Sequence, residues 1–288
     1  MRERFYELAR EALDEDERVA LVTAQIGTAA IGEHPRHFDV GIREQLMIGV
    51  AAGLALEGYR PVAHSYTPFL VERPYEMLKL DLGHNDLGAV LVGIGGSYDA
   101  AHEGRTHQAP EDVALVAALP GWTIHVPGHA DELTPILADA FAGDGRVYVR
   151  LSEEANHARV DGGGFTVLHR GRPGAPLVLA VGPTLAPVLE AVAGRDLGVA
   201  YLATVRPFPH EALREALGDG TDAVLVEPYL AGTSAGEVAV ALSDRPHRLL
   251  ALGVPNAEFR HYGTGAEHRA AHGLDAAGIA RSLEAFLS

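Results

Sequence analysis

Glu44 is the first residue whose surroundings in the sequence could do chemistry. The segment 38–45, Phe-Asp-Val-Gly-Ile-Arg-Glu-Gln, is interpreted as a short strand, a glycine turn and the N-terminus of a helix, which places Glu44 where a strand ends. Ligands of α/β sheets bind where strands end, so a carboxylate at this point could hold or transfer a proton. Acidic residues also open helices because the helix dipole favours them there. A structural cap at the start of the helix is therefore the alternative role for Glu44.

A polar loop at 102–110 is the second candidate. Glu103, Arg105 and His107 crowd this loop, which follows an apolar run and precedes the helix expected at 110–119. Loops carry binding and catalytic groups more often than core positions do, and histidine changes its protonation state near neutral pH. The composition indicates a site for proton exchange or polar contacts, and a solvated surface loop is the alternative.

A third motif, at 232–236, has the pattern G-x-S-x-G of a serine-hydrolase nucleophile elbow around Ser234. Asp244 and either His247 or His268 follow in the chain order of such hydrolases. Several residues separate the expected strand from the first glycine, so the sharp turn of an elbow is not expected here. A loop of small residues that lets two backbones approach is the alternative.

Composition limits the classes of protein to consider. The 23 basic and 39 acidic residues give a net charge of −16, which argues against nucleic-acid binding because phosphates require clustered cations. Cysteine is absent, so disulfides and thiolate sites are excluded, and we expect a reducing, cytoplasmic location. We expect no secretory signal and no membrane span. His268 and His272 have the spacing of a shared metal site, although most such pairs are solvated surface residues.

The elements that position these residues are short apolar runs that alternate with helical patterns. Strands are predicted at 19–23, 61–65, 89–94, 123–126, 147–151, 177–181, 199–203, 223–226 and 249–252, and helices at 44–56, 74–82, 110–119, 131–141, 184–193, 210–217, 235–242 and 275–287. This alternation predicts an α/β fold with mainly parallel sheets flanked by helices. Three glycines at 160–164 divide it into two consecutive domains, 1–160 and 165–288. The nearly all-apolar stretch 46–56 is expected to be buried on every side.

The segments around Glu44 and 64–70 resemble the pyrimidine-binding domain of the transketolase-like family. Glu44 corresponds to the family's glutamate that contacts the aminopyrimidine ring of thiamine diphosphate. Tyr66 and Phe69 occupy the places of the aromatic residues that stack on that ring. The resemblance therefore implies thiamine diphosphate as cofactor, with Glu44 both as a catalytic and as a cofactor-binding residue.

The loop 102–110 is similar to the family's Gly-x-Thr-His segment, which meets the sugar substrate. The similarity implies a catalytic and substrate-binding role for His107 and substrate contacts for Glu103 and Arg105. Arg150 corresponds to an arginine that often contacts substrate phosphate. Two positions depart from the family pattern, because Glu103 stands where aspartate is usual and Arg105 where a small residue or proline is usual.

The second half of the chain resembles the family's C-terminal domain, through the segments 177–184, 200–209 and 273–279. The diphosphate-binding domain, which carries the magnesium ligands, has no counterpart in this sequence. The resemblance thus implies the C-terminal subunit of a split transketolase, which moves a two-carbon ketol unit from a ketose to an aldehyde. It also implies a diphosphate-binding N-terminal subunit as partner, which supplies the Mg²⁺ ligands, and homodimerisation of this chain in an α₂β₂ assembly.

Other interpretations of the function remain. One is the β subunit of a 2-oxo acid decarboxylating enzyme or of an enzyme like 1-deoxyxylulose-5-phosphate synthase. Another is a regulatory subunit that keeps the fold without catalysis, against which the presence of Glu44 and His107 argues. The unrelated alternative is the serine hydrolase that uses Ser234.

Overall fold

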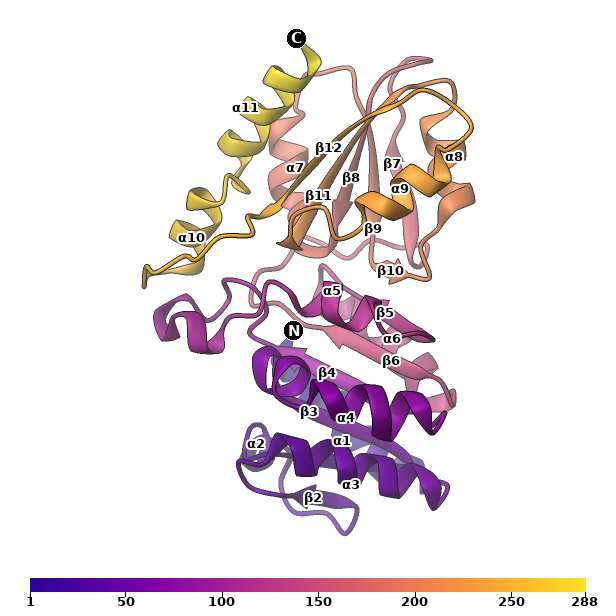
Figure 1. Ribbon diagram of the computed structural model, residues 1–288, viewed down its shortest axis with the longest axis vertical. Coiled ribbons are helices and arrows are strands. Elements are labelled where there is room, and N and C mark those ends of the chain that lie inside the picture. Colours follow the sequence, from indigo (N-terminus) through magenta and orange to yellow (C-terminus); the bar gives the residue numbers. More distant parts are fainter.

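The computed structural model describes residues 1–288, which form two β-sheets (Figure 1). The first sheet has the order β10 (Thr204–Arg206), β5 (Trp122–His125), β6 (Arg146–Arg150), β4 (Val90–Ile94), β3 (Arg60–Tyr66), β1 (Val19–Thr23) and β2 (His37–Asp39). The second has the order β12 (Arg248–Val254), β11 (Asp222–Leu230), β8 (Leu177–Val181), β9 (Gly198–Leu202) and β7 (Phe165–His169). Neighbouring strands are parallel except at the edge pairs β10–β5 and β7–β9. The predicted fold class is confirmed.

Helices cover both faces of each sheet. They are α1 (Arg2–Glu15), α2 (Thr28–Ile31), α3 (Glu44–Leu56), α4 (Tyr75–Met77), α5 (Asp112–Ala117), α6 (Leu133–Ala142), α7 (Leu185–Ala191), α8 (His210–Leu217), α9 (Ala235–Ala241), α10 (Gly265–Ala271) and α11 (Ala276–Leu287). On the first sheet, α1 and α6 pack on one face and α3 and α5 on the other. On the second sheet, α7 and α11 share one face, and α8 and α9 cover the other. Every residue of β1, β4, β8 and β9 is buried, as expected of strands covered on both faces.

The two sheets share the largest of the three apolar clusters, and each also has a cluster on its other face. A single cluster of 35 buried apolar side chains includes Val22 and Leu91 of the first sheet together with Leu179 and Leu225 of the second. In addition, β10 crosses the predicted domain boundary and adds an antiparallel strand to the edge of the first sheet, beside β5. The sequence did not predict β10 because three residues are too few to show a periodic pattern.

Helix α3 is not buried on every side, so that prediction is wrong for this chain. Met47 and Ile48 are fully buried, whereas Leu46 and Leu56 on the same helix are 48% and 70% exposed. Ile42, just before the helix, is 66% exposed. We call Ile42, Leu46 and Leu56 the α3 apolar face. None of the helices combines the length and the apolar composition that a membrane span requires.

Candidate active site

Glu44 is held at the start of α3 by a turn and by one ion pair. Gly41 has a φ of 68°, a conformation that favours glycine, and it lets the chain turn from β2 into the helix. The Glu44 side chain is only 2% exposed, and Arg73 Nη1 donates a hydrogen bond of 2.7 Å to its Oε2 atom. Oε1 accepts no hydrogen bond from within the chain and is therefore available to an outside donor.

Arg73 connects Glu44 to an aromatic cluster. Its guanidinium carbon lies 4.1 Å from the centroid of the Phe69 ring, a distance at which a cation is attracted to the ring face. Phe69 lies in the π-helical turn Pro68–Glu72 that follows β3. Arg73 was missed in the sequence because its neighbours match no motif, and only the fold shows that it reaches Glu44.

His107 completes this cluster from a different part of the chain. Its ring centroid lies 5.4 Å from that of Tyr66 and 5.0 Å from that of Phe69, and both pairs are edge-on. Aromatic rings prefer such edge-to-face contacts. The carboxyl end of β3, which carries Tyr66, and the 102–110 loop therefore meet at one place, the edge at which parallel sheets bind ligands.

The Nδ1 atom of His107 has neighbours that orient the ring. Thr106 Oγ1 lies 2.9 Å from Nδ1, and the Glu103 carboxylate lies 3.6 Å from it. Nε2 has no hydrogen-bond partner in the chain, and a quarter of the side chain is exposed. A histidine held at Nδ1 and open at Nε2 can give or take a proton at that second atom.

The Arg105 side chain lies outside the cluster of Glu44, Phe69 and His107. Its guanidinium donates to the Gln108 carbonyl and to Glu111 Oε1, both at 2.7 Å, and Glu258 lies 3.9 Å away. These contacts place it beside a separate cavity of about 280 Å³ that is also lined by Glu111 and Glu258. The structure therefore brings Glu44, Tyr66, Phe69, Glu103 and His107 together and leaves Arg105 outside.

Arg150 has a different environment from the one expected of a substrate contact. Its side chain is 1% exposed, and Nε donates a hydrogen bond of 2.8 Å to Asp112, which is fully buried. Tyr148 donates to the same carboxylate oxygen at 2.7 Å. Burial opposes the positive charge, but the Asp112 carboxylate outweighs it and raises the pKa of Arg150 above its ordinary value. The buried Arg150 side chain thus links β6 to Asp112 at the start of α5.

Replacing Asp112 with alanine is expected to reduce the free energy of unfolding by about 3–5 kcal/mol, because Arg150 would be left buried without its counter-charge. Urea denaturation followed by circular dichroism measures this loss. The matched control is Asp144→Ala, since the Asp144 side chain is 92% exposed and a surface pair contributes only about 0–1 kcal/mol. Equal losses in both variants would contradict the structural role of the buried pair.

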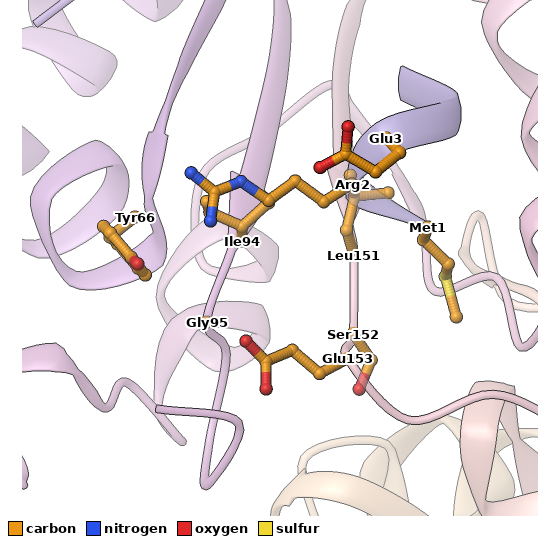
Figure 2. A pocket seen from close by; sticks show the side chains of 9 residues that line it. All are labelled: Met1, Arg2, Glu3, Tyr66, Ile94, Gly95, Leu151, Ser152 and Glu153. Carbon is orange, nitrogen blue, oxygen red and sulfur yellow. The ribbon is translucent and has the colours of Figure 1, made fainter. Parts of the chain in front are cut away.

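A cavity of about 200 Å³ opens beside Tyr66 (Figure 2). It lies where β3, β4 and β6 end, and the start of α1 forms its other wall. Its lining residues are Met1, Arg2, Glu3, Tyr66, Ile94, Gly95, Leu151, Ser152 and Glu153. Because Tyr66 also packs against His107, the cavity adjoins the aromatic cluster. We call it the Tyr66 cavity.

Ser234 is not a hydrolase nucleophile. It is fully buried, its N–H donates to Glu227, and its hydroxyl accepts from Arg206 at 3.3 Å. β11 does reach closer to the glycine than the sequence indicated, but no histidine hydrogen-bonds to Ser234. Asp244 instead forms an ion pair of 2.7 Å with Arg214. The hydrolase interpretation is therefore wrong.

The side chains of His268 and His272, which were considered for metal binding, pack against an aromatic ring. His268 is 1% exposed, and its ring packs edge-on against Phe259, with the centroids 4.7 Å apart. The rings of His268 and His272 lie 6.3 Å apart. No group of three or more histidine, aspartate or glutamate side chains is arranged to hold a metal ion.

Comparison with known proteins identifies the family. Residues 1–157 match the family model described as the transketolase pyrimidine-binding domain. The chain therefore belongs to the transketolase family, whose enzymes depend on thiamine diphosphate, as the sequence motifs predicted.

Several individual proteins and one solved structure are similar to this chain. The chain is 48% identical over 287 residues to a 33.6 kDa protein of the fasciation locus of Rhodococcoides fascians, covering 96% of this chain and 91% of the relative. It is 32% identical to a 6-deoxy-6-sulfo-D-fructose transketolase subunit of a Clostridium species, covering 76% and 73%. It is 35% identical to a 1-deoxy-D-xylulose-5-phosphate synthase of Geobacter sulfurreducens, covering 93% of this chain but only 46% of that enzyme. A solved structure described as a split-gene transketolase, inactive beta4 tetramer, superimposes with a TM-score of 0.82 at 25% identity, covering 98% and 96%.

Proposed function

We propose that this chain is the C-terminal subunit of a split transketolase, which transfers a two-carbon ketol unit from a ketose to an aldehyde acceptor. The observation that carries the proposal is the continuous contact from Glu44 through Arg73 and Phe69 to His107. It joins a buried carboxylate, an aromatic surface and a histidine with an open nitrogen at the carboxyl ends of parallel strands, the edge at which such sheets bind ligands.

The residues at this site fit the pyrimidine ring of thiamine diphosphate. Glu44 Oε1 is free to accept a hydrogen bond from a ring nitrogen, and the half-buried Tyr66 and Phe69 offer apolar area against which a flat ring can pack. When bound, thiamine diphosphate supplies the electron sink that lets the carbon–carbon bond of the ketose break. The diphosphate and its Mg²⁺ would be held by the partner subunit.

The side chains of this chain then have separate tasks. Arg73 fixes the Glu44 carboxylate through Oε2, which leaves Oε1 to hold a proton of the bound ring. His107, oriented at Nδ1 by Thr106 and Glu103, presents Nε2 to the hydroxyls of the sugar. A group at this position can take the proton of a hydroxyl while the neighbouring bond breaks.

The relative from Geobacter sulfurreducens supports a second candidate, in which the donor is a 2-oxo acid that loses carbon dioxide. One experiment distinguishes the two functions. It uses the chain combined with its diphosphate-binding partner, thiamine diphosphate and Mg²⁺. Ketol transfer from a ketose without release of carbon dioxide supports the transketolase. Release of carbon dioxide from pyruvate supports the second candidate. Inactivity toward both donor classes would contradict the proposal.

His107→Ala is expected to reduce turnover of the ketose donor by about a hundredfold, while the affinity for thiamine diphosphate changes by less than about threefold. The reason is that His107 forms no hydrogen bond with Glu44, whereas its Nε2 is the atom proposed to meet the sugar. Steady-state kinetics and calorimetric titration of the complex measure the two quantities. His102→Ala is the matched control, because that side chain is 74% exposed. Equal losses of turnover and cofactor affinity would indicate a structural role for His107.

A further inference from the structure

We infer that Tyr262, from the second half of the chain, is a positioning residue for His107, because its ring holds the backbone of Gly104 at the start of the turn that carries His107. The inference rests on the proposed function, since it concerns the same site. The other residues of that site, such as Glu44 and Arg73, belong to the first half. The inference therefore gives the second half a part in catalysis.

The His107 side chain is carried by two short 3₁₀ turns that meet at Gly104. The turns span Ala101–Glu103 and Arg105–His107, and the His107 N–H donates a hydrogen bond of 3.0 Å to the Gly104 carbonyl. Gly104 has a φ of 73°, and glycine is free to adopt many other conformations. The hydrogen bonds of 3₁₀ turns also have poor geometry. The direction of His107 therefore depends on what restrains the backbone at Gly104.

The Tyr262 ring supplies this restraint from a distant part of the sequence. A Cβ atom built on Gly104 would lie 2.5 Å from Tyr262 Cε1, 3.1 Å from Cζ and 3.2 Å from Cδ1. These are the three atoms nearest to that position, so the ring packs directly on the Gly104 backbone. Tyr262 lies between β12 and α10, and this segment runs beside the loop that precedes α5 (Figure 1).

The segment that carries Tyr262 is fixed to the second half on both sides of the ring. Before it, Phe259 packs against the rings of His268 and His272, with centroids 4.7 Å and 4.8 Å away. After it, the Thr264 hydroxyl accepts a hydrogen bond from the Glu267 N–H and caps α10. These anchors let a single ring hold a loop that belongs to the other half.

A positioning role is separable from a role in stability at this residue. Tyr262 is 75% exposed, so its ring removes little apolar area from water and contributes little to the free energy of unfolding. Its contact with Gly104 instead restricts one backbone position, three residues before His107 in the chain. Small displacements of a catalytic group reduce turnover strongly.

Tyr262→Ala is expected to reduce kcat of the reconstituted complex with a ketose donor by about tenfold, while the affinity for thiamine diphosphate changes by less than about twofold. Tyr262→Phe keeps the ring that packs on Gly104 and should retain turnover within about twofold of the wild type. Steady-state kinetics and calorimetric titration measure these quantities. Equal losses of turnover in the two variants would show that the phenol hydroxyl is the important group, and would overturn the positioning role.

A double-mutant cycle tests whether Tyr262 acts through His107. Residues that act as one unit have non-additive effects, so Tyr262→Ala should cause no further loss of turnover in a chain that already carries His107→Ala. A full tenfold loss in both backgrounds would overturn the inference. Arg260→Ala is the matched control, because its exposed side chain lies in the same segment, and it should leave turnover unchanged in either background.

A measurement without turnover separates this inference from the proposed function. The His107 ring signal in nuclear magnetic resonance spectra of the full chain, labelled at histidine, is assigned by its absence in His107→Ala. It should shift in Tyr262→Ala and remain in place in Tyr262→Phe and in Arg260→Ala. An unmoved His107 signal in Tyr262→Ala would overturn the inference alone. Inactivity of the wild-type complex toward every ketose would overturn the proposed function, and the catalytic part of the inference with it.

Discussion

Glu44→Gln is expected to reduce turnover of the reconstituted complex by about a hundredfold or more, because a glutamine cannot exchange a proton at this position. The fold should remain intact, since the glutamine oxygen can still accept the hydrogen bond that Arg73 donates at 2.7 Å. Steady-state assays of ketol transfer measure the first effect, and circular dichroism with thermal unfolding measures the second.

The matched control for this variant is Glu57→Gln, just after the other end of the same helix. Glu57 is exposed and forms no ion pair, so its loss should change turnover by less than about twofold. Near-normal turnover of Glu44→Gln in a complex that binds thiamine diphosphate would show that the residue is only a helix-opening group. A variant that fails to fold would be replaced by Glu44→Asp, which keeps the acid but moves it.

The isolated chain is expected to turn over substrate at least about a thousandfold more slowly than the complex with its diphosphate-binding partner, because the catalytic groups are then not assembled around the cofactor. Two observations support this expectation. The α3 apolar face stays exposed in the single chain, and apolar side chains left exposed together can form an interaction surface. The chain also has no group of acidic or histidine side chains arranged to hold a metal ion, so the Mg²⁺ that accompanies the diphosphate would have to be held elsewhere.

Calorimetric titration of the purified chain with thiamine diphosphate and Mg²⁺ should show weak binding or none, and the partner should restore binding and turnover together.

Leu56→Glu should weaken assembly as measured by sedimentation, because it places a charge on the α3 apolar face, far along the helix from Glu44. Val240→Glu on α9, where Val240 is 63% exposed, is the control and should leave assembly unchanged. Full ketol transfer by the chain purified to homogeneity would contradict the requirement for a partner.

Much of the fold could be predicted because its strands are covered on both faces. A doubly covered strand has to be apolar along its whole length, and such runs mark β1, β4, β8 and β9 in the sequence. α3 was predicted with the boundaries that the structure shows, Glu44–Leu56. The edge strands β7 and β10 were missed because each is partly exposed or very short, so neither forms a continuous apolar run. The short strand expected just before Gly41 is present as β2.

The grouping of the candidate site residues in space could be predicted in part from the sequence. Glu44, Tyr66, Phe69, Glu103 and His107 come together because they follow the ends of neighbouring strands or open the adjacent helix, and this placement is set by local sequence. The intrachain contacts of Arg105 and Arg150 were not foreseen, because they depend on which carboxylates the fold brings to each arginine. The partner of Arg150 lies 38 residues away in the sequence, and no local pattern identifies it.

The apolar cluster shared by the two sheets couples the unfolding of the two halves of the chain. Because one apolar cluster includes side chains from both halves, neither half can melt without exposing apolar area of the other, and a partly unfolded form is energetically costly. The short strand β10, which comes from the second half and hydrogen-bonds to the first sheet, adds to this coupling. We therefore expect that a protease cut in the glycine run at 162–164 would leave two fragments that remain associated, and that the chain would unfold in one cooperative transition in spite of its two sheets.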